Sequence, residues 1–383
     1  ALFNEELGAL LQLREADVER AFAAFEKRGL SRGRHLHVVG EPDASDALVV
    51  ESNGAELFRA TRTELLRIWT ETSHAIQALR DNARSAEQER ELISDASDPG
   101  LVPHLTFDLD EEVERSAASH VTLVEDRPRV AILREQGVNS QVEMAAAFLR
   151  VGFSAVDVHM SDLLSGKVGL ESFRGLAACG GFSYGDVLGA GLGWAKSILW
   201  SERARAEFSK FFRRPDTFTF GACNGCQMVS GLKALIPGAE AWPKFVRNDS
   251  EQFEARLSLV EVPESPSVLF QGMAGSRIPI PVAHGEGRAS FASPADLEAC
   301  TESGLVALRF VDHRGRPTEH YPENPNGSPR GITGVTTRDG RVTILMPHAE
   351  RGFRSVQLSH HPRGWGERSP WLRLFANARR WVG

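Results

Sequence analysis

Short apolar runs alternate with amphipathic stretches from Arg129 onward. The runs with the composition of buried strands are RVAIL, AVDVHM, GLAACGG and TFTFGAC, and the stretch SQVEMAAAFLRVG has helical spacing. Strands that alternate with helices predict a doubly wound α/β fold with a mostly parallel sheet, whose functional residues lie at the carboxyl ends of the strands. Two glycine-rich turns, CGGFSYGD and GACNGC, occupy such positions.

The alternation changes between about Phe245 and Met346. This interval contains the longer β-type runs FEARLSLVEV, IPIPVAHGEGR and GLVALRFVD, separated by turns. We expect these runs to form an added antiparallel β layer. The chain then ends in SPWLRLFANARRWV, whose apolar spacing predicts an amphipathic helix.

The N-terminal third has a different pattern. Residues 14–28 carry apolar positions at helical spacing, and a longer helical pattern extends from Gly54 to about Ile93. Residues 94–128 lose this periodicity and gather Asp, Pro and Gly, as linkers do. The sequence therefore predicts three parts, at 1–53, 54–128 and 129–383. The first is a short α/β segment, the second a long helix with a linker, and the third the main domain.

The chain opens with ALFNEELGALLQL, which lacks an initial Met and has the apolar content of a strand. Domains rarely begin inside such a run. We therefore expect the chain to be the C-terminal part of a longer polypeptide, in which 1–53 is the end of a preceding domain.

Composition and charge narrow the range of partners. Of 383 residues, 42% are apolar and 25% are charged, as in ordinary globular proteins. The net charge is −7 and no basic stripe runs along the sequence, which argues against nucleic acid as a partner. No apolar run has the length of a membrane span, so no membrane partner is expected. The cysteines are few, and we expect a reducing, cytoplasmic location. They are Cys179, Cys223, Cys226 and Cys300.

Cys223 and Cys226 form a C-x-x-C pair directly after an expected strand. A zinc site needs about four ligands, and no second pair accompanies these two. A redox dithiol at a helix N-terminus has the same spacing, so that role stays open. However, Gly221 and Gly225 flank Cys223 in the pattern G-x-C-x-G, the cysteine counterpart of the nucleophile elbow. This pattern predicts that Cys223 is a nucleophile and that Cys226 packs in the core.

A cysteine nucleophile needs a base and a group that orients the base. His348 and Glu350 follow the expected strand RVTILMP and are two residues apart, so they point to the same side of an extended segment. We therefore expect His348 to face Cys223 and Glu350 to hold the imidazole in its working tautomer.

Acyl transfer also needs hydrogen-bond donors for the developing oxyanion. The backbone N–H of Asn224 directly follows the nucleophile, and Gly180 and Gly181 lie at the end of the neighbouring expected strand. We expect these amides to form the oxyanion hole.

Together these residues resemble a known family. The order of a strand, GACNGCQ and a later H-x-E is similar to that of class I, or triad, glutamine amidotransferases. Longer segments resemble the C-terminal portion of single-chain phosphoribosylformylglycinamidine synthases: GGFSYGDVLGAG, CNGCQMVSGLKALIPG, FVRNDSEQFEARLSLVEV, HGEGR, NPNGS and HHPRGWGERSPWLRLFANARRWVG. This resemblance covers Arg129 to Gly383 and implies a flavodoxin-like fold. The opening LFNEELGALLQL resembles the end of the ATP-dependent synthetase half.

The resemblance implies a reaction. Cys223 attacks the side-chain amide of L-glutamine and forms a glutamyl thioester and ammonia, with His348 as base and acid and Glu350 as its orienter. In the complete enzyme the ammonia reaches a synthetase site, where ATP and Mg²⁺ activate formylglycinamide ribonucleotide in purine biosynthesis. The chain has neither a P-loop nor the paired carboxylates of a Mg²⁺ site, so we expect nucleotide and metal to bind upstream. Its expected partners are L-glutamine and the upstream synthetase domains.

The resemblance also implies that Gln227 contacts the amino-acid end of glutamine and that Asn248 and Ser250 belong to the same pocket. Two positions depart from the family. Leu192 stands where Glu is expected, which bears on hydrogen bonds near the glutamine site, and Ala349 replaces a usual Pro, which bears only on loop rigidity. Two other functions stay open: a Cys-His hydrolase or peptidase of similar fold, and a catalytically silent module that docks to a synthetase.

Overall fold

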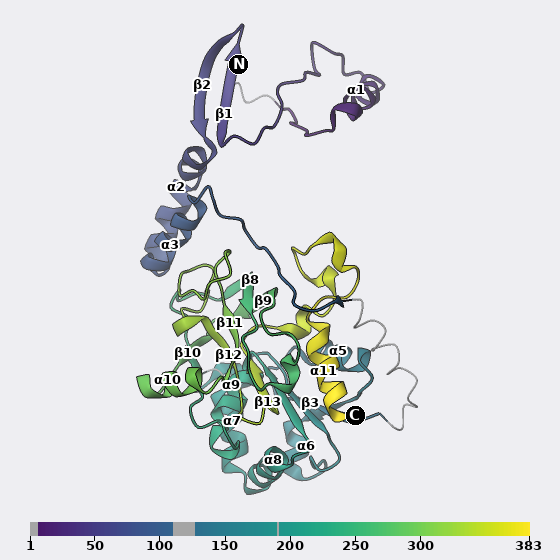
Figure 1. Cartoon of the computed structure of the whole chain (residues 1–383), viewed down its shortest axis with the longest axis vertical. Coiled ribbons are helices and arrows are strands. Elements are labelled where there is room, and N and C mark those ends of the chain that lie inside the picture. Colours follow the sequence, from purple (N-terminus) through teal and green to yellow (C-terminus); the bar gives the residue numbers. More distant parts are fainter. Residues whose placement is uncertain (1–6, 110–126, 190) are drawn as a thin grey trace. The chain divides into compact units, whose positions relative to one another are not determined.

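The computed structural model describes residues 7–109, 127–189 and 191–383 (Figure 1). Of the expected linker, residues 110–126 lie outside the described part. The chain divides after Arg62 into two compact units.

The first unit contains helix α1 (Val18–Glu26) and a hairpin of β1 (Ala47–Ser52) and β2 (Ala55–Thr61). Asn53 and Gly54 connect the two strands with φ angles of 52° and 79°. A two-residue loop with positive φ at both positions is the tight hairpin turn that Asn-Gly favours. The expectation of a helix from Gly54 is therefore wrong for residues 55–61, because this turn signal outweighs the apolar spacing.

Two helices follow the hairpin in place of the single expected one. They are α2 (Arg62–Arg80) and α3 (Ala83–Ile93). Asn82 separates them in an extended conformation, and its side chain accepts a hydrogen bond from the Ser85 N–H at 3.1 Å. Such a cap satisfies an amide in the first turn of a new helix, which explains why the helical pattern is interrupted here.

Residues 83–107 contact the domain that follows them in the second unit. The Tyr321 N–H donates a hydrogen bond to Gln88 Oε1 at 3.1 Å, and His313 Nδ1 lies 2.7 Å from the Asp98 carboxylate. Part of the interval that the sequence predicted to be a linker is therefore packed against the domain.

The second unit is built on a nine-stranded sheet (Figure 1). The strands in spatial order are β4 (Ser154–His159), β3 (Arg129–Arg134), β5 (Gly175–Ala178), β6 (Phe218–Ala222), β13 (Val342–Leu345), β12 (Ile332–Thr336), β11 (Val306–Phe310), β8 (Glu254–Glu261) and β9 (Arg277–His284). Neighbours from β4 to β13 are parallel, whereas the pairs from β13 to β9 are antiparallel.

The antiparallel strands thus extend the same sheet, whereas the sequence predicted that they would add a layer to it. A separate small sheet pairs β7 (Lys244–Val246) with β10 (Arg288–Ser290). The register of the parallel strands places Ala178 beside Gly221 and Ala222 beside Leu345. The segments that follow β5, β6 and β13 therefore leave the sheet side by side, at the carboxyl ends of these strands.

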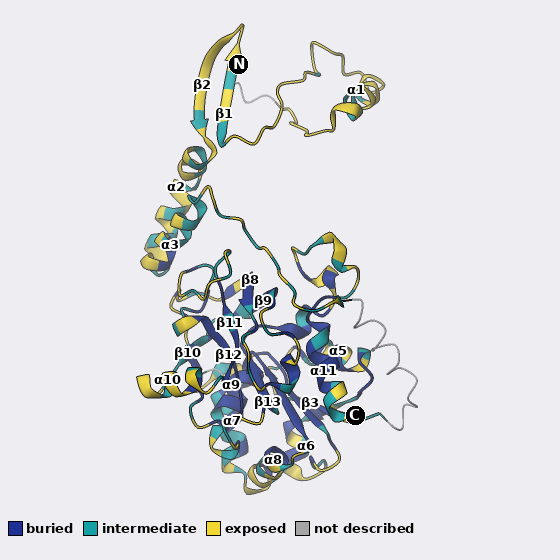
Figure 2. Ribbon diagram, in the orientation of Figure 1, coloured by how far each residue is buried: buried dark blue, intermediate teal, exposed yellow. Residues whose placement is uncertain are grey.

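The strands of the sheet are largely buried (Figure 2), and apolar side chains pack on both of its faces. Ala131 and Leu133 of β3 pack in one core cluster, and the alternate residues Val130 and Ile132 pack in the other. Burying apolar surface stabilises the fold by about 25 cal/mol per Å². Because these strands are buried on both faces, their sequences are unbroken runs of apolar residues.

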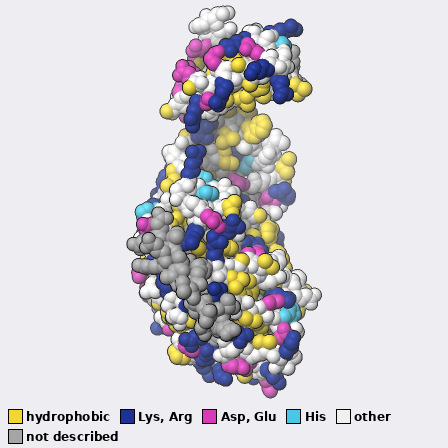
Figure 3. All heavy atoms as spheres, turned by 90° about the vertical axis from the view of Figure 1, so that its right-hand side faces the viewer, with side chains coloured by type: hydrophobic (Ala, Val, Ile, Leu, Met, Phe, Trp, Pro, Cys, Tyr) yellow, Lys and Arg dark blue, Asp and Glu magenta, His cyan; other side chains and the backbone are white. Residues whose placement is uncertain are grey.

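Helices supply the outer side of each cluster. Those contributing to the first are α6 (Met160–Ser165), α7 (Leu192–Trp200), α8 (Glu202–Arg213), α9 (Asn224–Gly231) and α10 (Pro294–Glu302), and those contributing to the second are α5 (Gln141–Arg150) and α11 (Leu372–Val382). On the face drawn in Figure 3, Lys and Arg side chains are interspersed with Asp and Glu. Within the described residues, no helix combines the length and the apolar character that crossing a membrane demands.

Candidate active site

Cys223 lies in a sharp turn between β6 and α9. Its φ of 50° and ψ of −112° are rare for a residue with a side chain, which marks a strained position held by its surroundings. Its N–H donates to the Leu345 carbonyl at 2.9 Å, and its own carbonyl accepts the Gln227 N–H at 3.0 Å. The strand, strained turn and helix have the geometry of a nucleophile elbow.

Two glycines allow the elbow to pack closely. A Cβ atom at Gly225 would stand 2.0 Å from the Ala178 carbonyl oxygen, so a larger residue would push α9 away from β5. A Cβ atom at Gly180 would stand 2.8 Å from His348 Cε1 and 3.2 Å from Cys223 Cβ. Glycine at both positions is therefore a condition for the approach of thiol and imidazole.

His348 and Glu350 lie in the segment after β13, next to the elbow. His348 Nδ1 is 2.6 Å from Glu350 Oε1, and both residues are buried, with exposed fractions of 1% and 0%. Because the carboxylate accepts the Nδ1 proton, Nε2 is left to act toward the thiol of Cys223. No hydrogen-bond partner of Nε2 occurs elsewhere among the described residues.

The thiol and the imidazole shift each other's pKa. Burial alone raises the pKa of Cys223, but the positive charge on His348 and hydrogen bonding with His284 and His348 outweigh it and lower the pKa to about 6. Burial lowers the pKa of His348, but the Glu350 carboxylate and the Cys223 thiolate outweigh it and raise the pKa to about 10. The pair is therefore stable as thiolate and imidazolium at neutral pH.

Candidate oxyanion donors lie beside the thiol. The Gly180 N–H is already donated to Ser140 Oγ at 2.6 Å. The N–H groups of Gly181 and Asn224, in contrast, have no acceptor within the described part of the chain. Donors that are adjacent to the nucleophile and not already used are what a developing oxyanion requires.

This arrangement of nucleophile, imidazole and carboxylate coincides with a family match. The model of the CobB/CobQ-like glutamine amidotransferase domain matches residues 127–382. The chain belongs to this glutamine amidotransferase family. PurLQS from Thermotoga maritima is similar in structure, with a TM-score of 0.51 and 24% identity over 67% of this chain and 100% of that one. A glutamine amidotransferase from the same organism has a TM-score of 0.33 and 17% identity over 58% of this chain and 76% of that one.

The likeness to PurLQS shows the fold, and the family match makes the protein an amidotransferase enzyme. Its α/β fold with a large sheet agrees with the architecture predicted from the sequence. Membership in a glutamine amidotransferase family also implies glutamine as the substrate.

Gln227 of the amidotransferase links three segments around the thiol. Its Nε2 donates to the Glu286 carbonyl at 2.6 Å, and its Oε1 accepts from Asn224 Nδ2 at 3.2 Å. Asn224 Oδ1 in turn accepts the Ser183 N–H at 3.2 Å. This chain of hydrogen bonds ties the loop after β5, helix α9 and the loop after β9 into one frame.

Asn248 and Ser250 lie in the loop after β7, and their side chains are engaged with backbone. Asn248 Nδ2 donates to the His284 carbonyl at 2.9 Å, and its Oδ1 accepts the Gly287 N–H at 2.8 Å. Ser250 Oγ accepts the Gln252 N–H at 3.4 Å. Asn248 therefore shapes the site through the loop 284–287.

His284 is a residue near the thiol that sequence reasoning missed. It ends β9, is 3% exposed, and contributes to the lowering of the Cys223 thiol pKa. Its Nε2 lies 2.8 Å from Asn326 Oδ1. The signal in the sequence was the string HGEGR, in which a histidine directly follows a β-type run, just as His348 does.

Asp186 is a second residue near the thiol that was not predicted from the sequence. It lies in the loop after β5 with a positive φ of 57°, and its buried Oδ1 has no hydrogen-bond partner among the described residues. Burial raises the pKa of this carboxyl to about 6, and the nearby charges of Glu286 and Cys223 add to the effect. The loop therefore brings an acidic group of unusual pKa toward the thiol.

Cys226 is fully buried in the first core cluster, and burial raises the pKa of its thiol well above the ordinary value. Its side chain is therefore a neutral packing group next to a low-pKa cysteine.

The two positions that depart from the family pattern, Leu192 and Ala349, also have packing roles. Leu192 lies at the start of α7 near Gly189 and Gly231, and Ala349 is fully buried.

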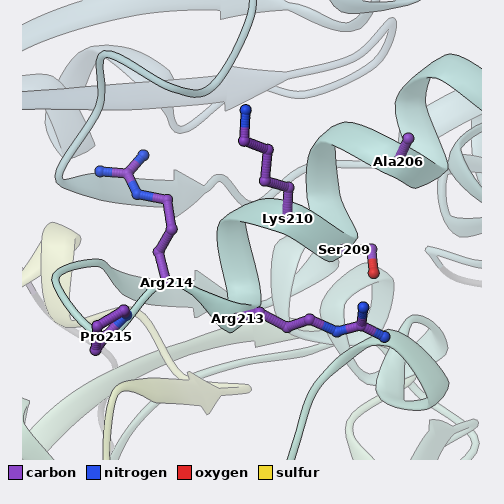
Figure 4. Close-up of a pocket in the computed structure, with 6 residues that line it drawn as sticks. All are labelled: Ala206, Ser209, Lys210, Arg213, Arg214 and Pro215. Carbon is purple, nitrogen blue, oxygen red and sulfur yellow. The ribbon is translucent and has the colours of Figure 1, made fainter.

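A surface hollow elsewhere on the amidotransferase is separate from this site (Figure 4). It is lined by Ala206, Ser209, Lys210, Arg213, Arg214 and Pro215, at the end of α8 and before β6, whereas Cys223 follows the other end of β6. Across residues 7–109, 127–189 and 191–383, no group of three or more His, Cys, Asp or Glu side chains is placed to hold a metal ion.

Proposed function

We propose that this chain is the glutaminase part of a phosphoribosylformylglycinamidine synthase. It hydrolyses L-glutamine through a Cys223 glutamyl thioester, and the released ammonia serves the ATP-dependent amidation of formylglycinamide ribonucleotide in purine biosynthesis. The observation that carries the proposal is the elbow thiol whose pKa of about 6 is set by a histidine bonded to a buried carboxylate, inside a glutamine amidotransferase domain.

The first half of the reaction uses the thiolate–imidazolium pair. The Cys223 thiolate attacks the carboxamide carbon of glutamine, and the oxyanion that forms takes hydrogen bonds from the Gly181 and Asn224 amides. The His348 imidazolium then gives its Nε2 proton to the amide nitrogen, the C–N bond breaks, and ammonia leaves. A glutamyl thioester and a neutral His348 remain.

The second half regenerates the enzyme. Neutral His348 takes a proton from water, whose oxygen attacks the thioester carbonyl, and the C–S bond breaks to release glutamate. The proton stays on His348 and restores the ion pair with the Cys223 thiolate. Glu350 holds the imidazole in one orientation through both halves, because its hydrogen bond to Nδ1 persists in either protonation state.

Glutamine recognition involves groups around the thiol. Gln227 is the proposed contact for the amino-acid end, with Asn248 and Ser250 supporting the pocket wall from the loop after β7. ATP and Mg²⁺ belong to the upstream synthetase domains in this proposal, and those domains are the proposed physiological partners in the cytoplasm. The sequence motifs that resemble the synthase family over Arg129 to Gly383 support this assignment.

The proposal is tested by incubating the purified chain with L-glutamine and measuring glutamate and ammonia, with the Cys223→Ala protein as control. We expect equal amounts of the two products from the parent protein and none from the variant. Cleavage of peptide or ester substrates without ammonia release from glutamine would favour the Cys-His hydrolase instead. No turnover, and no labelling of Cys223 by an electrophilic glutamine analogue even with synthetase domains present, would favour a silent docking module.

A further inference from the structure

The segment that follows β5 is paired with the segment that follows β3. The Phe182 N–H donates to the Gly137 carbonyl at 2.9 Å. The Tyr184 N–H donates to the Gln136 carbonyl at 3.0 Å. A Cβ atom at Gly137 would stand 2.2 Å from the Phe182 carbonyl oxygen, so the two segments approach each other closely. The segment after β3 therefore supports the oxyanion segment from one side.

This pairing determines where the Gly181 N–H points. Successive amides of an extended segment point to opposite sides, and those of Gly180 and Phe182 both point to the segment after β3. The Ser183 N–H, on the other side, donates to Asn224 Oδ1 at the start of α9, at 3.2 Å. The Gly181 N–H shares the direction of the Ser183 N–H. It therefore points toward α9 and the nucleophile, as an oxyanion donor must.

The oxyanion segment continues into a strained loop. Tyr184, Asp186 and Leu188 have φ angles of 53°, 57° and 72°, in the left-handed region that residues with side chains rarely adopt. Such conformations persist only where surrounding contacts hold them. A strained loop this close to the Gly181 amide needs an anchor, because its relaxation would displace the amide.

The side chain of Tyr184 is placed to be that anchor. Its hydroxyl donates to Glu135 Oε2 at 2.7 Å, and Ser197 of α7 is a second hydrogen-bond partner. Glu135 is 5% exposed, and its Oε1 accepts the Gln136 N–H at 2.8 Å. The same oxygen lies 3.6 Å from His159 Nε2. Because both of its oxygens are engaged, the carboxylate is fixed and holds the tyrosine at the end of β3.

We propose that Tyr184 and Glu135 are positioning residues that hold the Gly181 N–H where the oxyanion forms. The inference rests on the proposed function, because the oxyanion is that of the reacting glutamine amide. Neither residue exchanges a proton in the cycle. Without the bond between them the strained loop relaxes and the Gly181 amide leaves its place, so the loss is confined to steps that form an oxyanion.

Removing one hydroxyl tests this role. In the full chain, Tyr184→Phe should lower kcat for L-glutamine by about tenfold to fiftyfold, with KM changed by less than about threefold, because a transition-state donor is displaced. Alkylation of Cys223 by iodoacetamide should keep its rate, since this displacement needs the thiolate but forms no oxyanion. The matched control is Tyr321→Phe, which removes a hydroxyl 3.4 Å from the buried Glu254 carboxylate and should leave kcat unchanged.

The partner carboxylate gives a second set of variants. Glu135→Leu should lower kcat about as much as Tyr184→Phe, and the double variant should be little worse than either, because both changes break one hydrogen bond. Glu135→Gln keeps an oxygen acceptor and should retain most of the activity. Losses that multiply in the double variant, or that follow the melting temperature in the Tyr321→Phe control as well, would show a general effect on the fold and overturn the proposal.

Hydrogen exchange separates this inference from the proposed function. Deuterium uptake by the peptide of residues 180–188 should be faster in Tyr184→Phe than in the parent or in Tyr321→Phe, whether or not the chain uses glutamine. If the parent hydrolyses p-nitrophenyl acetate but releases no ammonia from glutamine, the proposed function fails. The inference then still predicts that Tyr184→Phe slows ester hydrolysis and leaves alkylation unchanged.

Three results would overturn the inference. Unchanged deuterium uptake in Tyr184→Phe would mean that the hydroxyl does not anchor the loop. Equal losses of kcat and of the alkylation rate would place its effect on the thiol and imidazole. A rise in KM with kcat unchanged would make Tyr184 a contact for the substrate in its ground state.

Discussion

The two histidines beside Cys223 come from the two halves of one sheet. His348 follows the parallel strand β13 and is bonded to a carboxylate, Glu350 Oε1, at 2.6 Å. His284 ends the antiparallel strand β9 and is bonded to an amide, Asn326 Oδ1, at 2.8 Å. A carboxylate stabilises an imidazolium, whereas a neutral amide only fixes a tautomer. The carboxylate therefore suits the His348 ring to carry a proton, whereas the amide holds the His284 ring in one orientation.

The nucleophile of the parallel half carries the largest expected effect. Cys223→Ala should abolish glutamine-dependent activity completely, since no other group at the elbow can form the thioester. Ammonia-dependent synthesis by the full-length enzyme should persist, because free ammonia bypasses this domain. Steady-state assays with glutamine and with ammonium chloride check both. Loss of both activities in a folded variant would contradict the assignment of Cys223.

Removing the proton carrier should be nearly as severe. His348→Ala should lower kcat/KM for glutamine by about 10²- to 10⁴-fold, because the thiol loses its proton acceptor and the leaving nitrogen its donor. Alkylation of Cys223 by iodoacetamide at pH 7 should slow in the same variant, since less thiolate is present. Unchanged alkylation would show that another group lowers the thiol pKa.

The partner carboxylate should matter less than the ring it holds. Glu350→Ala should cause a loss of kcat/KM about one to two orders of magnitude smaller than that of His348→Ala, because an orienting group improves a base that still exists. The double variant should be little worse than His348→Ala alone. Losses that multiply in the double variant would mean that the two residues do not act as one unit.

The pH dependence of kcat/KM for glutamine reports the ionisation of both the Cys223 thiol and the His348 imidazole. The Cys223 pKa of about 6 and the His348 pKa of about 10 predict that kcat/KM for glutamine is high between these values. It should fall as pH drops through about 6, because the thiolate is protonated, and fall again as pH rises through about 10, because the imidazolium is lost. A lower limb near 9, the ordinary thiol value, would show that the ion pair does not form.

The smallest effect is expected at the second cysteine. Cys226→Ser should keep kcat/KM within about threefold, because a buried thiol of raised pKa is a packing group. Burying a hydroxyl in place of a thiol carries a desolvation cost, so unfolding should become easier by about 1–3 kcal/mol. Cys226→Ala serves as the matched control in thermal unfolding. Abolished activity in both variants, with the fold intact, would revive the dithiol alternative.

The sequence predicted the site best where a functional residue directly follows a strand. The elbow around Cys223 and the pair His348 and Glu350 are local strings next to apolar runs, and parallel strands bring such ends together. The turn at Asn53-Gly54 is equally local, but the helical apolar spacing of residues 54–93 obscures the hairpin signal. A helical pattern and a twisted strand share apolar positions, so this choice depends on the turn residues.

His284, Asn326 and Asp186 could not be found in the same way. His284 reaches the thiol from an edge strand of the sheet, and the order of antiparallel strands is not encoded in local periodicity. Asn326 acts only by orienting a ring that lies 42 positions away along the chain. Asp186 differs from other loop carboxylates only by its burial. Each depends on tertiary contacts that a single sequence does not reveal.

The central claim is that Cys223 forms a glutamyl thioester, and trapping that adduct tests it most directly. The full chain is mixed with L-glutamine, quenched in acid, digested and analysed by mass spectrometry, with Glu350→Ala included because slower hydrolysis should increase the trapped fraction. The account predicts a glutamyl adduct on the peptide that contains Cys223 and none on Cys179, Cys226 or Cys300. Glutamate and ammonia released without an adduct at Cys223, or an adduct on Cys226, would contradict it.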